Sequence, residues 1–423
     1  MFPINAVILG IMVISVLAQD ASGTCKLSIG VPAPLVITNF GSQRILSDFL
    51  STYEAENGQT IRLSCASGFA ADYAYNFGDQ TSQTVDATEL TVTCVSDQRF
   101  TFIYNDITYD MNSVRCLEDG PQLFESMTKL PNCTGITLVL GKKFDGKVLI
   151  KDSALCYDLA ASQLKYIGYT TSFHNIRIVS ENQLGQLNNI GLDIPIRYQK
   201  YLFETIRKSE LAAYLAKEKQ FFTENTFQIG SLVQDELVSR HLVGYEDLMS
   251  TVWLEVLRSG NWKHWTKAMH DAIGVHFDIR LGVSGTVKLP TSTGQSCNAS
   301  RSLNIELLSG KSLPIPAHIW AHVQAVEKTG TGQDEFVIIG HNSPFYRSDL
   351  SNLCPSMCNQ VSWLRNTLFA RLHEFPAFGM VQCCRVEDVA HKLDNFPGPF
   401  ENANMNVSRT TEATTTPTVG LAY

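Results

Sequence analysis

The stretch Thr226–Asp271 decides how this chain is organised, and it reads TFQIGSLVQDELVSRHLVGYEDLMSTVWLEVLRSGNWKHWTKAMHD. Near its start an apolar run ends in Gly230 and Ser231, and near its end the segment Leu257–Trp262 precedes residues that we expect to be helical. Large aromatic side chains are more often buried than exposed for stacking, so we interpret three tryptophans of the stretch as core residues: Trp253, Trp262 and Trp265. We expect the catalytic or binding centre to lie here.

The length and charge of the chain limit what it can be. At 423 residues it is too long for one ordinary hydrophobic core and fits two domains. Its formal net charge of −8 argues against strong general attraction to nucleic acid, because such binding comes from Lys and Arg displacing counterions. Between Arg197 and His270 there are 10 Lys and Arg against 9 Asp and Glu. Even the expected substrate face therefore carries no clear excess of positive charge.

The first residues indicate the compartment. Ala6–Ala18 is an uncharged apolar run of signal-peptide length, with small residues at Val16 and Ala18 that suit cleavage before Gln19. The alternative is a membrane anchor, but the run is shorter than the roughly 20 residues needed to span a bilayer. No later segment is long and apolar enough to do so. We expect residues 1–18 to be a signal peptide and the protein to be secreted, extracellular and without a membrane partner.

The eleven cysteines agree with secretion. In an oxidising compartment we expect about five disulfides and one cysteine left over. The alternative is a zinc site made by the Cys354–Cys358 spacing and the Cys383-Cys384 pair, although that spacing lacks the paired motif typical of zinc ligands. Three Asn-x-Ser/Thr sites are expected to be glycosylated if they lie on exposed loops: Asn132, Asn298 and Asn406.

The pattern of short alternating runs divides the chain. Residues 19–120 contain strands of period two, and Cys65 and Cys94 lie in such strands and could bridge two sheets, so we expect a small disulfide-bonded β module. Residues 121–395 form a second domain with further strands and a helix expected over Ile196–Phe222. Residues 396–423 are Thr-rich and predict a disordered tail.

A family resemblance follows from ordered motifs. Phe227–Leu232 is similar to an Arg-Gly-His-Leu element after a strand, and Leu257–Trp262 is similar to an Asn-x-Gly-Asn-Trp turn that begins a helix. Further landmarks occur between Gly135 and Cys384, among them Leu313–Trp320. The chain resembles the DNA/RNA non-specific endonuclease family in its secreted insect branch. This resemblance implies an α+β fold: a small N-terminal β module followed by a ββα-metal endonuclease-like domain with a central mixed β-sheet flanked by helices.

The residues that the resemblance implies for catalysis are replaced. In the family a His is the general base, an Asn binds Mg²⁺, a Glu holds a metal-bound water and an Arg binds phosphate. Here Ser231 stands at the His position, Arg258 at the Asn position, Thr266 at the Glu position and Ile229 at the Arg position. A guanidinium has no lone pair for a metal. We therefore assign no catalytic or metal-binding residue and expect no cofactor, in contrast to the Mg²⁺ of active family members.

The leading hypothesis is a secreted family member that has lost hydrolysis and retains at most weak binding of nucleic acid or of an unidentified extracellular protein. We expect any nucleic acid to be contacted by Arg258, Lys263, Lys267 and Arg240.

Two alternatives stay open. The first is an active Mg²⁺-dependent endonuclease with a rearranged site, in which His241 or His270 is the base and Asp271 or Asp235 binds the metal. His264 lies on the same expected helix as His270, six residues earlier, so the two face different sides. The second is an extracellular structural or interaction glycoprotein that uses the β module and the tail.

Overall fold

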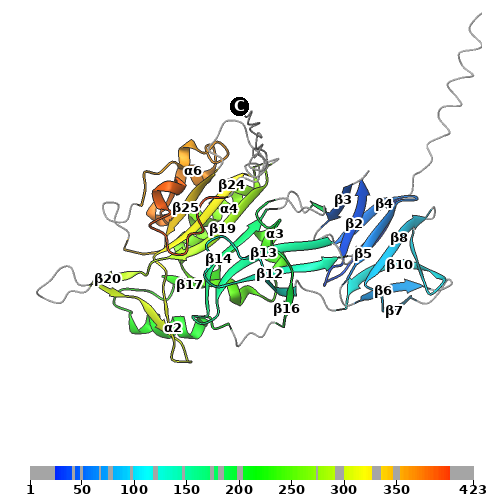
Figure 1. Cartoon of the computed structure of the whole chain (residues 1–423), viewed down its shortest axis with the longest axis horizontal. Coiled ribbons are helices and arrows are strands. Elements are labelled where there is room, and N and C mark those ends of the chain that lie inside the picture. The colour runs from blue at the N-terminus through cyan, green and yellow to red at the C-terminus, as the bar shows by residue number, and fades with distance from the viewer. Residues whose placement is uncertain are drawn as a thin grey trace, which may run out of the picture.

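The computed structural model has an α+β fold in which strands predominate (Figure 1). It describes residues 24–40, 43–47, 51–65, 68–74, 80–95, 99–117, 122–144, 148–171, 176–179, 185–197, 203–272, 275–290, 300–325, 335–345 and 353–400. The expected signal peptide, Cys297, Asn298, Asn406 and residues 401–423 of the expected tail lie outside these residues. Within them, no helix has the length and apolar character needed to cross a membrane.

The N-terminal module is a mixed sheet that curls around one core. Alternation builds it: in β8, Leu90, Val92 and Cys94 point inward while the residues between them are more exposed. The strand order is β3-β2-β5-β8-β9-β10-β1-β4, with β6 paired to β10 and β7. The strands are β1 (Thr24–Ile29), β2 (Leu35–Phe40), β3 (Gln43–Ser47), β4 (Thr52–Glu56), β5 (Thr60–Ser64), β6 (Phe69–Ala74), β7 (Gln80–Val85), β8 (Glu89–Val95), β9 (Arg99–Tyr104) and β10 (Ile107–Cys116).

Two disulfides close this core. Cys25 is bonded to Cys94 and Cys65 to Cys116. Cys65 and Cys94 are therefore both bridging residues, as expected, but each pairs with a different partner and not with the other. Sequence periodicity identifies which residues point inward, whereas the partner depends on which strands the fold brings together.

The second domain is built on a sheet of nine strands, and every pair in it is antiparallel. We expected a mixed sheet; here β11 to β14 follow one another through short connections, which favour antiparallel neighbours. The order is β16 (Ile194–Ile196), β11 (Gln122–Ser126), β12 (Ile136–Phe144), β13 (Val148–Asp158), β14 (Gln163–Thr170), β19 (Phe277–Ser284), β24 (His318–Ala325), β25 (Glu335–His341) and β26 (Val381–Cys384).

Both faces of this sheet are covered, because alternate residues of its strands point to opposite cores. In β12, Leu138 and Leu140 belong to the core under the helices, whereas Val139 belongs to a second core on the other face. That second core also contains Phe396, and Phe400 is buried nearby, although composition placed both in the tail. The last described segment therefore packs against the sheet.

The helices are short. The helix predicted over Ile196–Phe222 is helical in the described residues only over α2 (Lys208–Lys217), because Arg207 is extended and the Glu210 side chain caps its backbone N–H. The other helical elements are α3 (Glu236–His241), η3 (Glu246–Met249), η4 (Leu257–Trp262), α4 (Lys263–His270), η5 (Cys358–Gln360), α6 (Leu368–Leu372), η6 (Pro376–Phe378) and α7 (Val386–Val389). Three separate hairpins pair β17 (Phe227–Ser231) with β18 (Ser250–Leu254), β20 (Lys288–Pro290) with β21 (Ser300–Ser302), and β22 (Asn304–Glu306) with β23 (Ser312–Pro314).

One strand crosses between the two parts of the chain. β15 (Ile176–Val179) follows the second domain's β14 but pairs antiparallel with β3 of the N-terminal sheet. The chain thus returns from the second domain to add an edge strand to the N-terminal sheet, a contact that periodicity alone does not predict.

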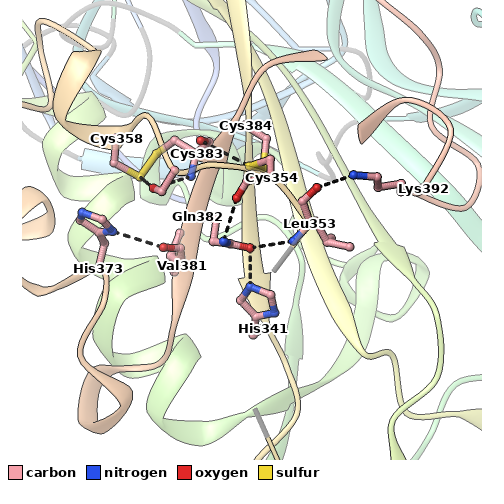
Figure 2. Close-up of a disulfide and its surroundings, with 11 residues drawn as sticks. His341, Leu353, Cys354, Cys358, His373, Val381, Gln382, Cys383, Cys384 and Lys392 are labelled. Atoms are coloured by element: carbon pink, nitrogen blue, oxygen red, sulfur yellow. Dashed lines mark hydrogen bonds between the residues drawn. A yellow bond between two sulfur atoms is a disulfide. The ribbon is translucent and has the colours of Figure 1, made fainter. Parts of the chain in front are cut away.

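The remaining three disulfides staple the second domain. Cys133 is bonded to Cys156, and the adjacent Cys383 and Cys384 are bonded to Cys358 and Cys354 (Figure 2). Successive residues of β26 point to opposite faces of the sheet. The two disulfides therefore attach the segment around Cys354 and Cys358 to both faces. The four cysteines considered as zinc ligands are thus all oxidised, which rules out that alternative. Five disulfides are typical of proteins from oxidising compartments.

A buried asparagine attaches the β17–β18 hairpin to the large sheet. Asn342 is fully buried; its amide donates to the carbonyls of Val252 (2.9 Å) and Pro316 (2.8 Å), and its oxygen accepts from the N–H of Leu254 (2.5 Å). The side chain thus satisfies three main-chain groups that water does not reach.

We predict that Asn342→Ala lowers the free energy of unfolding by about 3 kcal/mol, because it leaves buried backbone groups without partners. Chemical denaturation of the purified protein measures this. Asn304→Ala, at an exposed position, is the matched control and should change stability little. Equal stability of the two variants would contradict the assigned role of Asn342.

Candidate functional site

The stretch Thr226–Asp271 contains a strand–strand–helix unit formed by β17, β18 and α4. β17 and β18 pair antiparallel from Phe227 opposite Leu254 to Ser231 opposite Ser250. The chain then turns through η4 and continues as α4. α4 begins directly after Trp262, as predicted from sequence.

The Gly-Asn-Trp turn is held by the segment around η6. A Cβ at Gly260 would lie 2.4 Å from the Phe378 carbonyl oxygen, so only glycine permits this approach. Asn261 is fully buried and donates to the carbonyls of Leu372 (2.7 Å) and Gly379 (2.5 Å). These residues therefore fix the angle between hairpin and helix.

The three tryptophans of the unit form a continuous buried cluster. Trp253 and Trp262 meet edge to face with ring centroids 5.3 Å apart, and Trp262 and Trp265 do so at 5.1 Å. None exposes more than 1% of its surface. The interpretation as core residues is confirmed, and none of them offers a ring to a nucleic-acid base.

Arg258 is clamped against strand β17. Its guanidinium lies over Gly230, where a Cβ would stand 2.5 Å from the Arg258 Nε, and its Nη1 donates to the Gln228 side-chain oxygen (3.2 Å). Its Nε is buried and forms no hydrogen bond with another described residue. Burial lowers the pKa of Arg258 from its ordinary value, but a guanidinium stays charged at physiological pH. The unit thus holds a cation beside its first strand.

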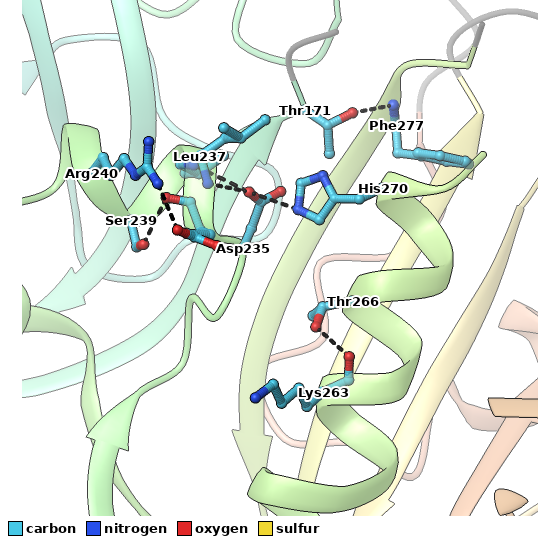
Figure 3. A network of polar contacts seen from close by, with 11 residues as sticks. Thr171, Asp235, Leu237, Ser239, Arg240, Lys263, Thr266, His270 and Phe277 are labelled. Atoms are coloured by element: carbon cyan, nitrogen blue, oxygen red, sulfur yellow. Dashed lines mark hydrogen bonds and ion pairs between the residues drawn. The ribbon is translucent and has the colours of Figure 1, made fainter. Parts of the chain in front are cut away.

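The other two substituted positions serve local structure. The Ser231 hydroxyl accepts from the N–H of Val233 (3.1 Å) just beyond the strand. The Thr266 hydroxyl donates to the Lys263 carbonyl within α4 (2.9 Å; Figure 3), and Thr266 is buried. Neither group has the chemistry of a general base at neutral pH.

The donors at these positions do not fit the Mg²⁺ that the family resemblance implies. Mg²⁺ requires oxygen ligands and usually carboxylates, and these positions supply a guanidinium and two hydroxyls committed to the backbone. In the part of the chain that the structure describes, no three His, Cys, Asp or Glu side chains gather as a metal-binding group.

The histidines of the alternative site lie in two separate pairs. His270 Nε2 lies 3.2 Å from Asp235, and His241 lies 3.8 Å from Asp152 (Figure 3 for the first pair). Asp235 is only 1% exposed and accepts from the N–H groups of Leu237 and Val238, so it caps α3. The structure therefore brings His270 and Asp235 together, but as a link between two helices.

The remaining expected contact residues lie at the surface. Arg240 pairs with Glu236 (2.6 Å), and Lys267 pairs with Asp271 (3.2 Å), each within its own helix. Lys263 is exposed on α4. Local carboxylates therefore offset much of this positive charge.

His264 contacts a different part of the molecule from His270. Its ring packs near Phe378, with centroids 6.0 Å apart, and burial lowers its pKa. The expectation that the two histidines of α4 face different sides is confirmed.

Sequence reasoning did not single out the buried histidines of β24 and β25. His318 and His341 are cross-strand neighbours with centroids 5.2 Å apart, and burial lowers the pKa of each to about 4. His322 lies 2.7 Å from Glu335, and burial also lowers its pKa to about 4. All three are therefore neutral at physiological pH. Their alternating spacing in one strand is the only sequence signal that could have identified His318 and His322 as sheet residues.

Asn132 lies on an exposed turn, as a glycosylation site requires. Its amide nitrogen donates to the Pro397 carbonyl (2.9 Å). An attached glycan would take one of the two hydrogens of this nitrogen and leave one donor.

We predict that His270→Gln destabilises the protein more at pH 6 than at pH 9. These two pH values lie on either side of the pKa of histidine in an unfolded chain, about 6.5. The hydrogen bond to Asp235 raises the pKa of His270, so the charged pair stabilises the fold below the unfolded pKa, and this contribution is lost as pH rises through the folded pKa. Thermal unfolding across this range measures it, with His391→Gln at an exposed position as the control. A destabilisation that did not change with pH would contradict the charged pair.

Comparisons with known proteins assign no family to this chain. No protein-family model matches the chain, and no curated protein matches it. The function is therefore inferred from the residues and their arrangement.

Proposed function

We propose that this protein is a secreted relative of the DNA/RNA non-specific endonucleases that has kept the ββα-metal nuclease scaffold and does not hydrolyse phosphodiesters. The observation that supports the proposal is the β17–β18–α4 unit with Arg258 clamped over Gly230. The order of elements agrees with the family resemblance, and the cation stands near the strand where the family's catalytic histidine is expected.

The chemistry of the three substituted positions favours an inactive protein. Loss of a general base alone commonly lowers a rate by about 10²–10⁴-fold. Here Ser231 cannot take a proton, and Arg258 both lacks a lone pair and repels a divalent cation. Because base and metal ligand are changed together, hydrolysis by the family mechanism would need both to be replaced from elsewhere.

Residual binding of a polyanion would be weak. Arg258 and the exposed Lys263 can approach phosphate, whereas Lys267 and Arg240 are partly neutralised by carboxylates of their own helices. Affinity that comes from so few charges falls steeply with salt. We therefore place nucleic acid second to an extracellular protein as a partner.

The five disulfides and the apolar run at residues 6–18 support a secreted location.

The pairing of His270 with Asp235 is the one observation that favours an active, rearranged nuclease. Against it, the Asp235 Oδ1 already accepts two main-chain N–H groups and faces His270, and the residue is 1% exposed, which leaves little room for a hydrated metal ion. Its buried Oδ2 has no hydrogen-bond partner among the described residues.

We predict that the purified protein does not nick supercoiled plasmid with Mg²⁺ or Mn²⁺ present. The double variant Ser231→His, Arg258→Asn restores the family's base and metal ligand and should gain metal-dependent nicking. Gel electrophoresis measures both, and Ser231→Ala, Arg258→Ala is the matched control that should stay inactive.

Metal-dependent nicking by the unmodified protein would contradict the proposal. If His270→Gln then abolished that nicking, the rearranged site would be the correct assignment.

Retention on immobilised DNA in low salt should be reduced by Arg258→Ala, with the slope of log affinity against log salt falling by about one.

A further inference from the structure

A cavity of about 450 Å³ opens beside the β17–β18 hairpin within the second domain. This volume lies in the usual range of small-molecule sites, roughly 300–1,000 Å³. Its walls come from the ends of β13, β14 and β19, the segment before α2, the hairpin, η3, β23 and the loop after α7. Because these elements belong to one packed core, the cavity exists without a ligand.

Part of the cavity lining is apolar. Ile229 lines it at the position where the family resemblance implies a phosphate-binding Arg, and Leu232, Leu248 and Leu313 extend this wall. Burying hydrocarbon here would stabilise a complex by about 25 cal/mol per Å². The wall therefore suits the apolar body of a small ligand.

The charged groups of the cavity are all acidic. Glu204, Asp247 and Asp394 line it, and among its described lining residues there is no Lys, Arg or His. His318 lies near Gly285 at the rim and close enough to Asp394 to feel its charge, but burial keeps this histidine neutral at physiological pH. The Lys311 ammonium contacts the lining residues Glu204 (3.0 Å) and Ser162 (3.1 Å) and offsets one of the three carboxylates. The lining residues together with Lys311 therefore carry a net negative charge, which disfavours anions.

Two of the carboxylates are held in place. Asp394 accepts from the N–H of Gly285 (2.8 Å), and its own N–H donates to the Ser284 hydroxyl (2.9 Å). One oxygen of Glu204 is buried without hydrogen-bond geometry to a described residue, and its ion-pair partner, 3.0 Å away, is the half-exposed Lys311. An incoming ammonium would compete with Lys311 for this oxygen.

We propose that this cavity binds a small organic cation, an amine carried on an apolar body, with the hydrocarbon against Ile229 and the ammonium beside Glu204 and Asp394. The site differs from the position of Arg258 in charge and in ligand, so it stands whether or not the protein cleaves nucleic acid. The Thr251 hydroxyl also lines the cavity, and the Ser250 hydroxyl, which donates to the Glu246 carbonyl (2.8 Å), keeps lone pairs that can accept from the ligand.

Titration of the full-length secreted protein with phenethylamine, followed by calorimetry and NMR, tests the proposal. Phenylacetate is the probe of similar size and opposite charge. We expect saturable binding of the amine and none of the anion. The variant Glu204→Gln, Asp394→Asn should weaken amine binding about tenfold or more, as expected for loss of charged hydrogen bonds.

Two further variants separate the cavity from general charge effects. Ile229→Arg places a guanidinium at the apolar wall and should abolish amine binding, whereas Asp271→Asn removes a carboxylate that is 62% exposed and paired on α4, and should leave the affinity unchanged. Thermal unfolding verifies that each variant is folded. Absence of amine binding, equal binding of phenylacetate, or equal weakening by Asp271→Asn would overturn the proposal.

Discussion

The clustered tryptophans of the strand–strand–helix unit are the constraint on which the site depends. Trp253 comes from the hairpin, Trp262 from the turn and Trp265 from the helix, and all three are buried together. Truncating a buried aromatic side chain of this kind costs about 3–5 kcal/mol. The cluster therefore fixes how α4 leaves the hairpin, and the hydrogen bonds of Asn261 fix the same turn from its other side. Because these contacts hold the unit together, other residues of the site can be substituted while the strand–strand–helix arrangement is kept.

Arg258 uses that fixed geometry in a different way from a metal ion. A metal site collects carboxylates that repel one another until the ion arrives, whereas a guanidinium brings its own charge and needs only acceptors and space. Gly230 provides the space and Gln228 the acceptor. The local backbone likewise uses the hydroxyls of Ser231 and Thr266. Both hydroxyls of the site thus have backbone partners, whereas the Arg258 Nε is a buried donor without a hydrogen bond to a described residue.

Sequence periodicity predicted the local features of the fold well and its long-range contacts poorly. The helix after Trp262, the strands of the N-terminal module and the burial of the tryptophans follow from patterns within a few residues. The pairing of β15 with β3 and the partners of Cys65 and Cys94 depend on segments far apart in the chain. A periodic pattern identifies a buried face but does not identify what covers it.

The side chains of the site also divide into those that local motifs predict and those that only long-range contacts bring together. Aligning motifs assigned Arg258 and Ser231 to one site, and the structure places the Arg258 guanidinium over Gly230, the neighbour of Ser231. It did not find the cavity, since Glu204 and Asp394 are 190 residues apart in sequence (394 − 204) and neither belongs to a motif. Both line one cavity because the fold brings the segment before α2 and the loop after α7 to the ends of β13, β14 and β19. Ile229 matters for this cavity because an Arg in its place would pair with the carboxylates and repel a cationic ligand, whereas the isoleucine leaves them to such a ligand.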